Sequence, residues 1–129
     1  MTKYQRWIQI GSEIIGNNSF VTVPNETPDS EMATPPTTIP AETSNFKIFE
    51  TVEIWRVKAM AIIANKDCVV TSSASESFTL KANSALIYVD GDPEGMRFFT
   101  QNFTWLSFTP VDQEETIVQF AHKDYAGDD

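Results

Sequence analysis

Between residues 46 and 122, hydrophobic and polar residues follow one another in short runs of the kind typical of β-strands. Phe78 and Leu80, for example, alternate with polar neighbours. Turn-forming polar residues separate the runs, and neither proline nor glycine occurs from residue 41 to residue 90. This pattern predicts strands at residues 68–72, 77–81, 85–89, 96–100, 103–108 and 116–121.

Residues 46–64 allow two interpretations. Phe46, Ile48 and Val52 share one face of a strand, and the apolar positions change face near Trp55, as a bulge or a break between two strands would produce. A helix is the alternative, because several apolar residues also recur at helical spacing. The high content of β-branched and aromatic residues favours strands.

Together these segments predict an all-β fold, a small antiparallel β-sandwich or barrel of about seven or eight short strands. The 129 residues suffice for one hydrophobic core. We expect an extended N-terminal arm with a short hairpin or edge strand and a Pro/Thr-rich tract at residues 1–45. The β-sandwich domain then covers residues 46–122, and an acidic C-terminal tail covers residues 123–129.

The arm is defined by its prolines, because five of the seven prolines lie between residues 22 and 44. Proline fixes φ and lacks an amide donor, which excludes a regular helix or an inner strand there. A tract of this composition gains order by lying on a protein surface, and the sequence leaves open whether that surface belongs to the same chain or to another. The residues expected to contact it are Trp7, Ile10, Pro24, Pro28, Met32, Pro35, Pro36, Ile39 and Pro40.

The net charge of −9 is concentrated outside the domain. Residues 7–46 carry five acids and no base, and residues 112–129 carry six acids and one base, whereas residues 47–111 sum to −1. Nucleic-acid binding depends on clustered Lys and Arg, so we expect no nucleic-acid partner. The single cysteine, Cys68, excludes an intrachain disulfide, and no signal peptide or membrane segment is recognisable. We expect a soluble protein without membrane contact.

The chain offers little for catalysis. The only histidine, His122, is expected in a flexible C-terminal region, which argues against a catalytic triad and against a metal site built on several histidines. We expect no Asp or Glu in a strongly apolar strand, where its pKa would rise. We therefore predict no enzyme, no catalytic residues, no cofactor and no metal.

Two features keep binding functions open. Asp90, Asp92 and Glu94 alternate with Gly and Pro, which resembles a calcium loop, although a solvated hairpin loop explains the same residues. Trp55 and Trp105 could form an exposed platform for a sugar, although a tryptophan in a strand more often belongs to the core.

Residues 57–89 read VKAMAIIANKDCVVTSSASESFTLKANSALIYV, with the rhythm strand, Asn-x-Asp, strand, polar turn, Ser-x-Thr-Leu-x-Ala-x-Ser, strand. This quarter of the chain resembles small β-sandwich accessory proteins of tailed-phage virions, such as capsid decoration proteins. The resemblance implies synthesis in the host cytoplasm, location in the virion, and an arm that lies across neighbouring subunits. It transfers no individual residue.

The sequence thus predicts a non-enzymatic virion structural protein, either a capsid decoration protein or a neck or tail accessory protein. Its partners would be other virion proteins, bound through the β domain and the arm, with the chain itself a homo-oligomer or present in many copies. The alternative is a carbohydrate-binding or ligand-binding β module, such as a phage adhesin.

Overall fold

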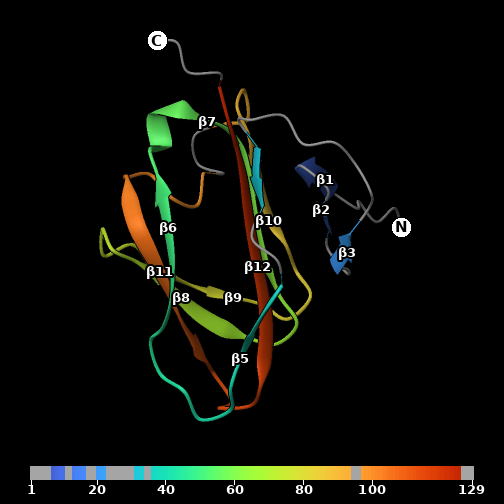
Figure 1. Cartoon of the computed structure of the whole chain (residues 1–129), viewed down its shortest axis with the longest axis vertical. Coiled ribbons are helices and arrows are strands. Elements are labelled where there is room, and N and C mark those ends of the chain that lie inside the picture. Colours follow the sequence, from blue (N-terminus) through green and yellow to red (C-terminus); the bar gives the residue numbers. More distant parts are fainter. Residues whose placement is uncertain are drawn as a thin grey trace.

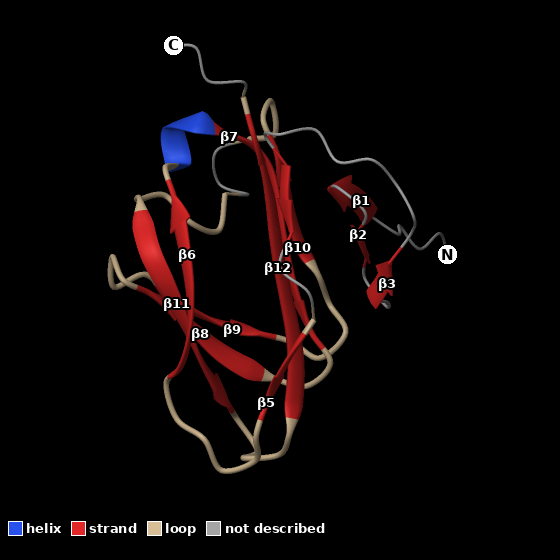
Figure 2. Ribbon diagram, viewed as in Figure 1, coloured by secondary structure: helices blue, strands red, loops and turns tan. Residues whose placement is uncertain are grey.

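Two antiparallel β-sheets face each other in the computed structural model of the chain, and a third, smaller sheet lies beside them (Figures 1 and 2). The structure describes residues 7–10, 13–16, 20–22, 31–33, 36–93 and 97–125, the first four segments by their backbone only. The predicted all-β sandwich is confirmed.

The first sheet, here called the β11 sheet, has the strand order β6-β11-β8-β9. Its strands are β6 (Phe46–Val52), β8 (Cys68–Ser72), β9 (Ser77–Leu80) and β11 (Phe103–Pro110). Burial alternates along β6, so that Phe46, Ile48, Glu50 and Val52 face the interior while Lys47, Phe49 and Thr51 face solvent. This alternation is the period of two that the sequence pattern predicts.

The second sheet, here called the β12 sheet, has the order β10-β7-β12-β4, and β5 also pairs with β12. Its strands are β4 (Glu31–Ala33), β5 (Thr37–Ile39), β7 (Val57–Ala64), β10 (Leu86–Val89) and β12 (Thr116–Asp124). Strands β7 and β12 are buried along most of their length because both faces of this sheet are covered.

The third sheet consists of β1 (Trp7–Ile10), β2 (Glu13–Gly16) and β3 (Phe20–Thr22). Strand β2 lies against β7, and β1 lies against β12 and β4, on the side away from the β11 sheet (Figure 1). A small apolar cluster on this outer side of the β12 sheet is buried, with Ala61, Ile63, Ile87 and Ala121 as its members. The N-terminal strands therefore add a third layer to the sandwich.

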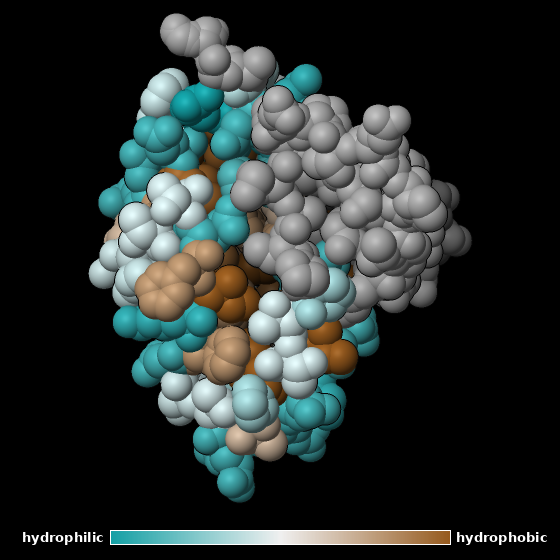
Figure 3. All heavy atoms as spheres, in the orientation of Figure 1, coloured by the Kyte–Doolittle hydropathy of each residue, from teal (hydrophilic) through white to brown (hydrophobic). Residues whose placement is uncertain are grey.

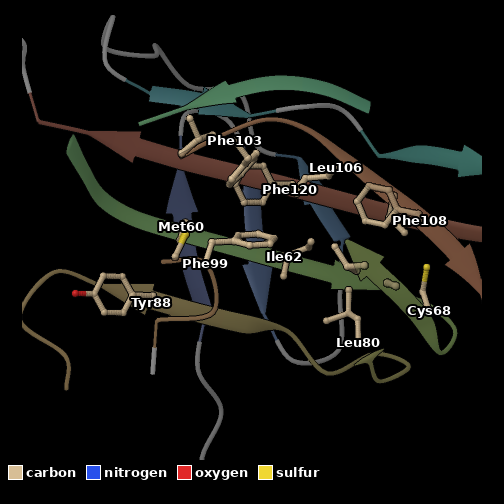
Figure 4. Close-up of a cluster of buried hydrophobic side chains, with 14 of the residues drawn as sticks. Met60, Ile62, Cys68, Leu80, Tyr88, Phe99, Phe103, Leu106, Phe108 and Phe120 are labelled. Atoms are coloured by element: carbon tan, nitrogen blue, oxygen red, sulfur yellow. The ribbon is translucent and has the colours of Figure 1, made fainter. Parts of the chain in front are cut away.

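The main core fills the space between the two large sheets. Figure 4 shows Met60 and Ile62 of β7, Phe120 of β12, and Leu106 and Phe108 of β11 within it. Figure 3 shows hydrophobic residues along the seam between the sheets, with hydrophilic residues around them.

The predicted strand at residues 96–100 is wrong. The described part, residues 97–100, is a loop whose Phe99 is fully buried, 4.8 Å from the ring centroid of Phe103 and 5.4 Å from that of Phe78. The carboxylate of Glu76 accepts hydrogen bonds from the backbone N–H groups of Thr100 (2.9 Å) and Gln101 (3.1 Å). These donors bind a side chain, so they are not available to a sheet.

Residues 46–64 form strands, which confirms the strand interpretation over the helical one. The change of apolar face near Trp55 is a short 3-10 helix, η1 (Ile54–Arg56), which joins β6 to β7. Its first N–H, on Ile54, donates to Oδ1 of Asn102 over 2.8 Å. This bond connects η1, the break between β6 and β7, to the residue directly before β11.

The proline-rich tract joins the sandwich at an edge. Pro36 and Pro40 flank the three residues of β5, which pairs with the first part of β12, while β4 pairs with its last part. Short edge strands next to prolines agree with the expectation that no inner strand forms there. The β-sandwich therefore includes Thr37–Ile39 and extends to Asp124, residues that the sequence analysis assigned to the arm and the tail.

Candidate functional site

The residues expected to contact a partner fall into three groups. Pro24, Pro28 and Pro35 lie outside the described residues. Trp7, Ile10 and Met32 lie in β1 and β4, whose backbones pair within the chain, with Met32 opposite His122. The third group, around β5, has its side chains described: Pro36 and Pro40 are exposed, and Ile39 is buried.

The prediction that Ile39 contacts a partner is wrong. Its side chain is 0% exposed and belongs to the main core, because β5 pairs with β12 and turns Ile39 towards the interior. A partner cannot reach it in the folded chain. The C-terminal end of the predicted arm thus contributes to the domain's own stability.

The outer side of the β11 sheet carries an exposed aromatic pair. Phe49 of β6 is 74% exposed and lies directly opposite Trp105 of β11 in the strand register. The ammonium group of Lys47 lies 4.4 Å from the centre of the Trp105 ring, a cation–π contact. We call this outer side, with Lys47, Phe49 and Trp105, the aromatic face.

Hydroxyl groups occupy much of the rest of the aromatic face. By strand alternation and register, Thr71, Ser77, Thr79 and Thr109 point to the same side as Trp105, as does Ser107, which is buried. Some of these hydroxyls already bond to neighbours: Thr71 and Ser77 lie 3.0 Å apart, and Thr109 accepts from the N–H of Asn45. The surface is a sheet face that combines two aromatic rings with hydroxyl groups.

The expectation that tryptophans in these strands belong to the core is wrong for two of them. Trp55 lies in η1 and is 70% exposed, with the Arg56 guanidinium 5.6 Å from its ring centre. Trp105 is only partly buried, because a register irregularity between Phe103 and Trp105 turns it outward. The Trp55 ring is exposed and available for binding, and the Trp105 ring is available in part.

The only histidine is part of a buried polar cluster that we call the clasp, formed by Glu50, His122 and Asp124. His122 lies in β12, is 2% exposed, and stacks on Phe120 at a centroid distance of 5.8 Å. Its Nε2 lies 2.9 Å from a carboxylate oxygen of Glu50, and its Nδ1 lies 2.9 Å from one of Asp124. The expectation of a flexible His122 is therefore wrong, because β12 continues beyond it to Asp124.

The two carboxylates control the charge of the histidine. Burial alone would lower the pKa of His122, but the hydrogen bonds and charges of Glu50 and Asp124 outweigh burial and raise that pKa above its usual value of 6.5. Protonated His122 donates to both carboxylates, whereas neutral His122 has one N–H and can donate to only one. The clasp joins β6 of one sheet to β12 of the other most strongly when His122 is charged.

The clasp is poorly suited to catalysis. Both ring nitrogens of His122 already face carboxylates, so neither is positioned to take a proton from a nucleophile. Sequence reasoning missed Glu50, although a signal was present: Glu50 has the same phase in β6 as Phe46, Ile48 and Val52, and so belongs to the buried face. An acid on an apolar strand face requires a partner.

The loop at residues 90–95 uses its acids for local bonds. The hydroxyl of Tyr125 donates to Asp90, and a carboxylate oxygen of Asp92 accepts from the N–H of Val89 over 3.0 Å. Gly91 has a φ of 105°, as a tight turn requires. Glu94 lies outside the described residues, and within the described residues no group of three His, Cys, Asp or Glu side chains is arranged to hold a metal ion.

Comparison with known proteins gives no relative: no family model, no curated protein and no solved structure matches the chain. Among the described residues the only helix is η1, whose three residues are far too few to cross a bilayer. The features of the chain that bear on its function are therefore the aromatic face, the clasp and the N-terminal strands.

Proposed function

We propose that this protein is a non-enzymatic structural protein of a tailed-phage virion, which binds a lattice of other virion proteins through its β-sandwich and its N-terminal segment. The proposal rests on one observation, the contrast between the bonded polar side chains of the clasp and the exposed aromatic side chains. The clasp residues Glu50, His122 and Asp124 bond to one another between the sheets, whereas Phe49 and Trp55 are exposed. Exposed aromatic side chains favour a contact surface.

The N-terminal strands support the same proposal. Strands β4 and β5 each have three residues and pair at one edge of the β12 sheet, and the tract that precedes them contains Pro24 and Pro28. The buried Ile39 holds β5 in the sandwich, whereas the proline-rich chain before it reaches about 3.1 Å per residue. A segment of this design can extend from its own domain to a neighbouring subunit.

Cosedimentation tests the proposal. Purified protein is added to phage particles assembled without it, and bound protein is measured at increasing concentration. We expect saturable binding with many copies on each particle, because lattice contacts act together. Failure to cosediment with capsids, necks and tails would remove the proposal.

The second candidate is a glycan-binding module, and the exposure of Trp55 and Trp105 favours it. Sugar rings stack on exposed aromatic side chains, and the hydroxyls of the aromatic face could donate to and accept from a glycan. A glycan array tests this function: reproducible hits that Trp105→Ala abolishes support it. An array without hits removes this candidate and leaves the structural proposal unaffected.

A further inference from the structure

The aromatic face differs in charge from the rest of the chain. The four strands of the β11 sheet contain a single acidic residue, Glu50, and its carboxylate points inward to His122. Their only basic residue is Lys47, which lies on the aromatic face. An acidic chain of net charge −9 thus has one sheet face without a strand carboxylate.

This distribution restricts how two copies can meet. Two molecules of charge −9 repel each other, and the repulsion extends over about 10 Å at moderate salt. Other surfaces bring acids together, such as the turn with Asp112, Glu114 and Glu115 or the region of Asp90 and Asp92. The aromatic face instead offers apolar rings, hydroxyls and one cation.

We propose that the aromatic face is the contact surface of a symmetric dimer of this chain. The proposal rests on the proposed structural function, and it names a second copy as the partner at that surface. In a two-fold dimer the same patch serves both subunits and must match itself. Hydroxyl groups satisfy this condition because each can both donate and accept, and aromatic rings pack well on one another.

The size of the face predicts a weak dimer. With strands about 4.8 Å apart and a rise of about 3.4 Å per residue, a four-stranded face of this length covers about 500 Å². Two such faces bury about 1,000 Å² in total, the lower end of specific interfaces. We expect an equilibrium between monomer and dimer that depends on concentration and strengthens with salt, because salt screens the repulsion between the copies.

Sedimentation equilibrium of the full chain over a wide range of concentration tests the dimer. The Phe49→Ser variant removes the most exposed ring of the face, and Trp55→Ser is its matched control, because Trp55 is similarly exposed but lies in η1 away from the face. We expect Phe49→Ser to remain monomeric and Trp55→Ser to dimerise like the wild type. Far-UV circular dichroism establishes that both variants are folded.

A charge variant adds a second test on the same face. Thr79 is exposed in β9, and Thr79→Glu places a carboxylate on the face of each copy, whereas Thr79→Gln adds similar bulk without charge. We expect Thr79→Glu to raise the dissociation constant about tenfold relative to Thr79→Gln, because the added carboxylate of each copy then enters a contact between two acidic chains.

Three results would overturn the dimer: a wild-type monomer at every concentration and salt level, equal effects of Phe49→Ser and Trp55→Ser, or glycan binding that depends on Phe49 in a monomer. If the wild type is monomeric but still binds phage particles, the dimer is wrong and the structural function stands. If it dimerises but binds no particle, the proposed function fails and the interface stands.

Discussion

Replacing His122 with glutamine tests the clasp, because glutamine keeps hydrogen-bonding groups but removes the positive charge between Glu50 and Asp124. The side chains of His122 and Glu50 are 3% and 13% exposed, so solvent shields their interaction weakly. A hydrogen bond to a charged group contributes about 1.5–3 kcal/mol, and loss of one partner of a buried ion pair costs about 3–5 kcal/mol. Asp124 is 25% exposed and can be partly rehydrated, so we expect a loss of about 2–4 kcal/mol.

The direction of the pH dependence follows from the raised pKa of His122. The folded state holds the imidazole proton more tightly than the unfolded chain, whose histidine pKa is near the usual 6.5. The clasp therefore contributes fully below pH 6.5, and its contribution is lost as the pH rises through the higher pKa of the folded state. The free energy of unfolding should fall in that window by at most about 1.4 kcal/mol per pH unit.

The groups around His122 make this window specific to the clasp. Glu50 faces it from β6 and Asp124 from its own strand, while the residues opposite it in β7 and β4 are Met60 and Met32. Methionine does not titrate. The change of charge in this window is therefore that of the His122 imidazole.

Urea denaturation, followed by tryptophan fluorescence at a series of pH values, measures this effect. The matched control is Lys66→Gln, which removes the exposed ion pair between Lys66 and Glu114 and should cost much less than His122→Gln. The reasoning is refuted if His122→Gln costs no more than the control below pH 6.5, or if wild-type stability rises through the window.

Three further predictions concern the core, the loop and the thiol. Ile39→Ala should lower the free energy of unfolding by about 2–4 kcal/mol in urea denaturation, because Ile39 is fully buried. A loss below about 0.5 kcal/mol would mean that β5 belongs to the arm and not to the core. Glu76→Ala should speed amide hydrogen exchange at Thr100 and Gln101, whose N–H groups it accepts, and unchanged rates would contradict this role. Burial raises the pKa of Cys68 to about 11, so the folded thiol should resist a disulfide reagent at pH 8 and react after unfolding; fast reaction with the folded chain would contradict its burial.

The strands of the sandwich could be predicted from local pattern alone. Residues 68–72 form β8 with the predicted bounds, because alternating burial and flanking turn residues are both visible in the sequence. Residues 96–100 have the same apolar appearance and still form a loop, because Glu76, distant in sequence, binds their backbone donors. Tertiary contacts of this kind have no signal in a local window.

The candidate sites depended on contacts between distant residues. Phe49 and Trp105 form a pair only because β6 and β11 are neighbours in a particular register. His122 and Glu50 are 72 positions apart, so sequence could show that Glu50 needs a buried partner but not which residue supplies it. In the same way, prolines indicated an extended tract around Ile39, while the burial of Ile39 followed from its pairing with β12.

Quantitative mass spectrometry of purified particles tests the structural function most directly. Under the proposed function the chain is encoded by a phage, so the virions of that phage are separated from soluble lysate proteins, and the chain is counted against the major capsid protein. The account predicts a fixed ratio corresponding to many copies per particle. A chain found only in the soluble fraction would contradict it.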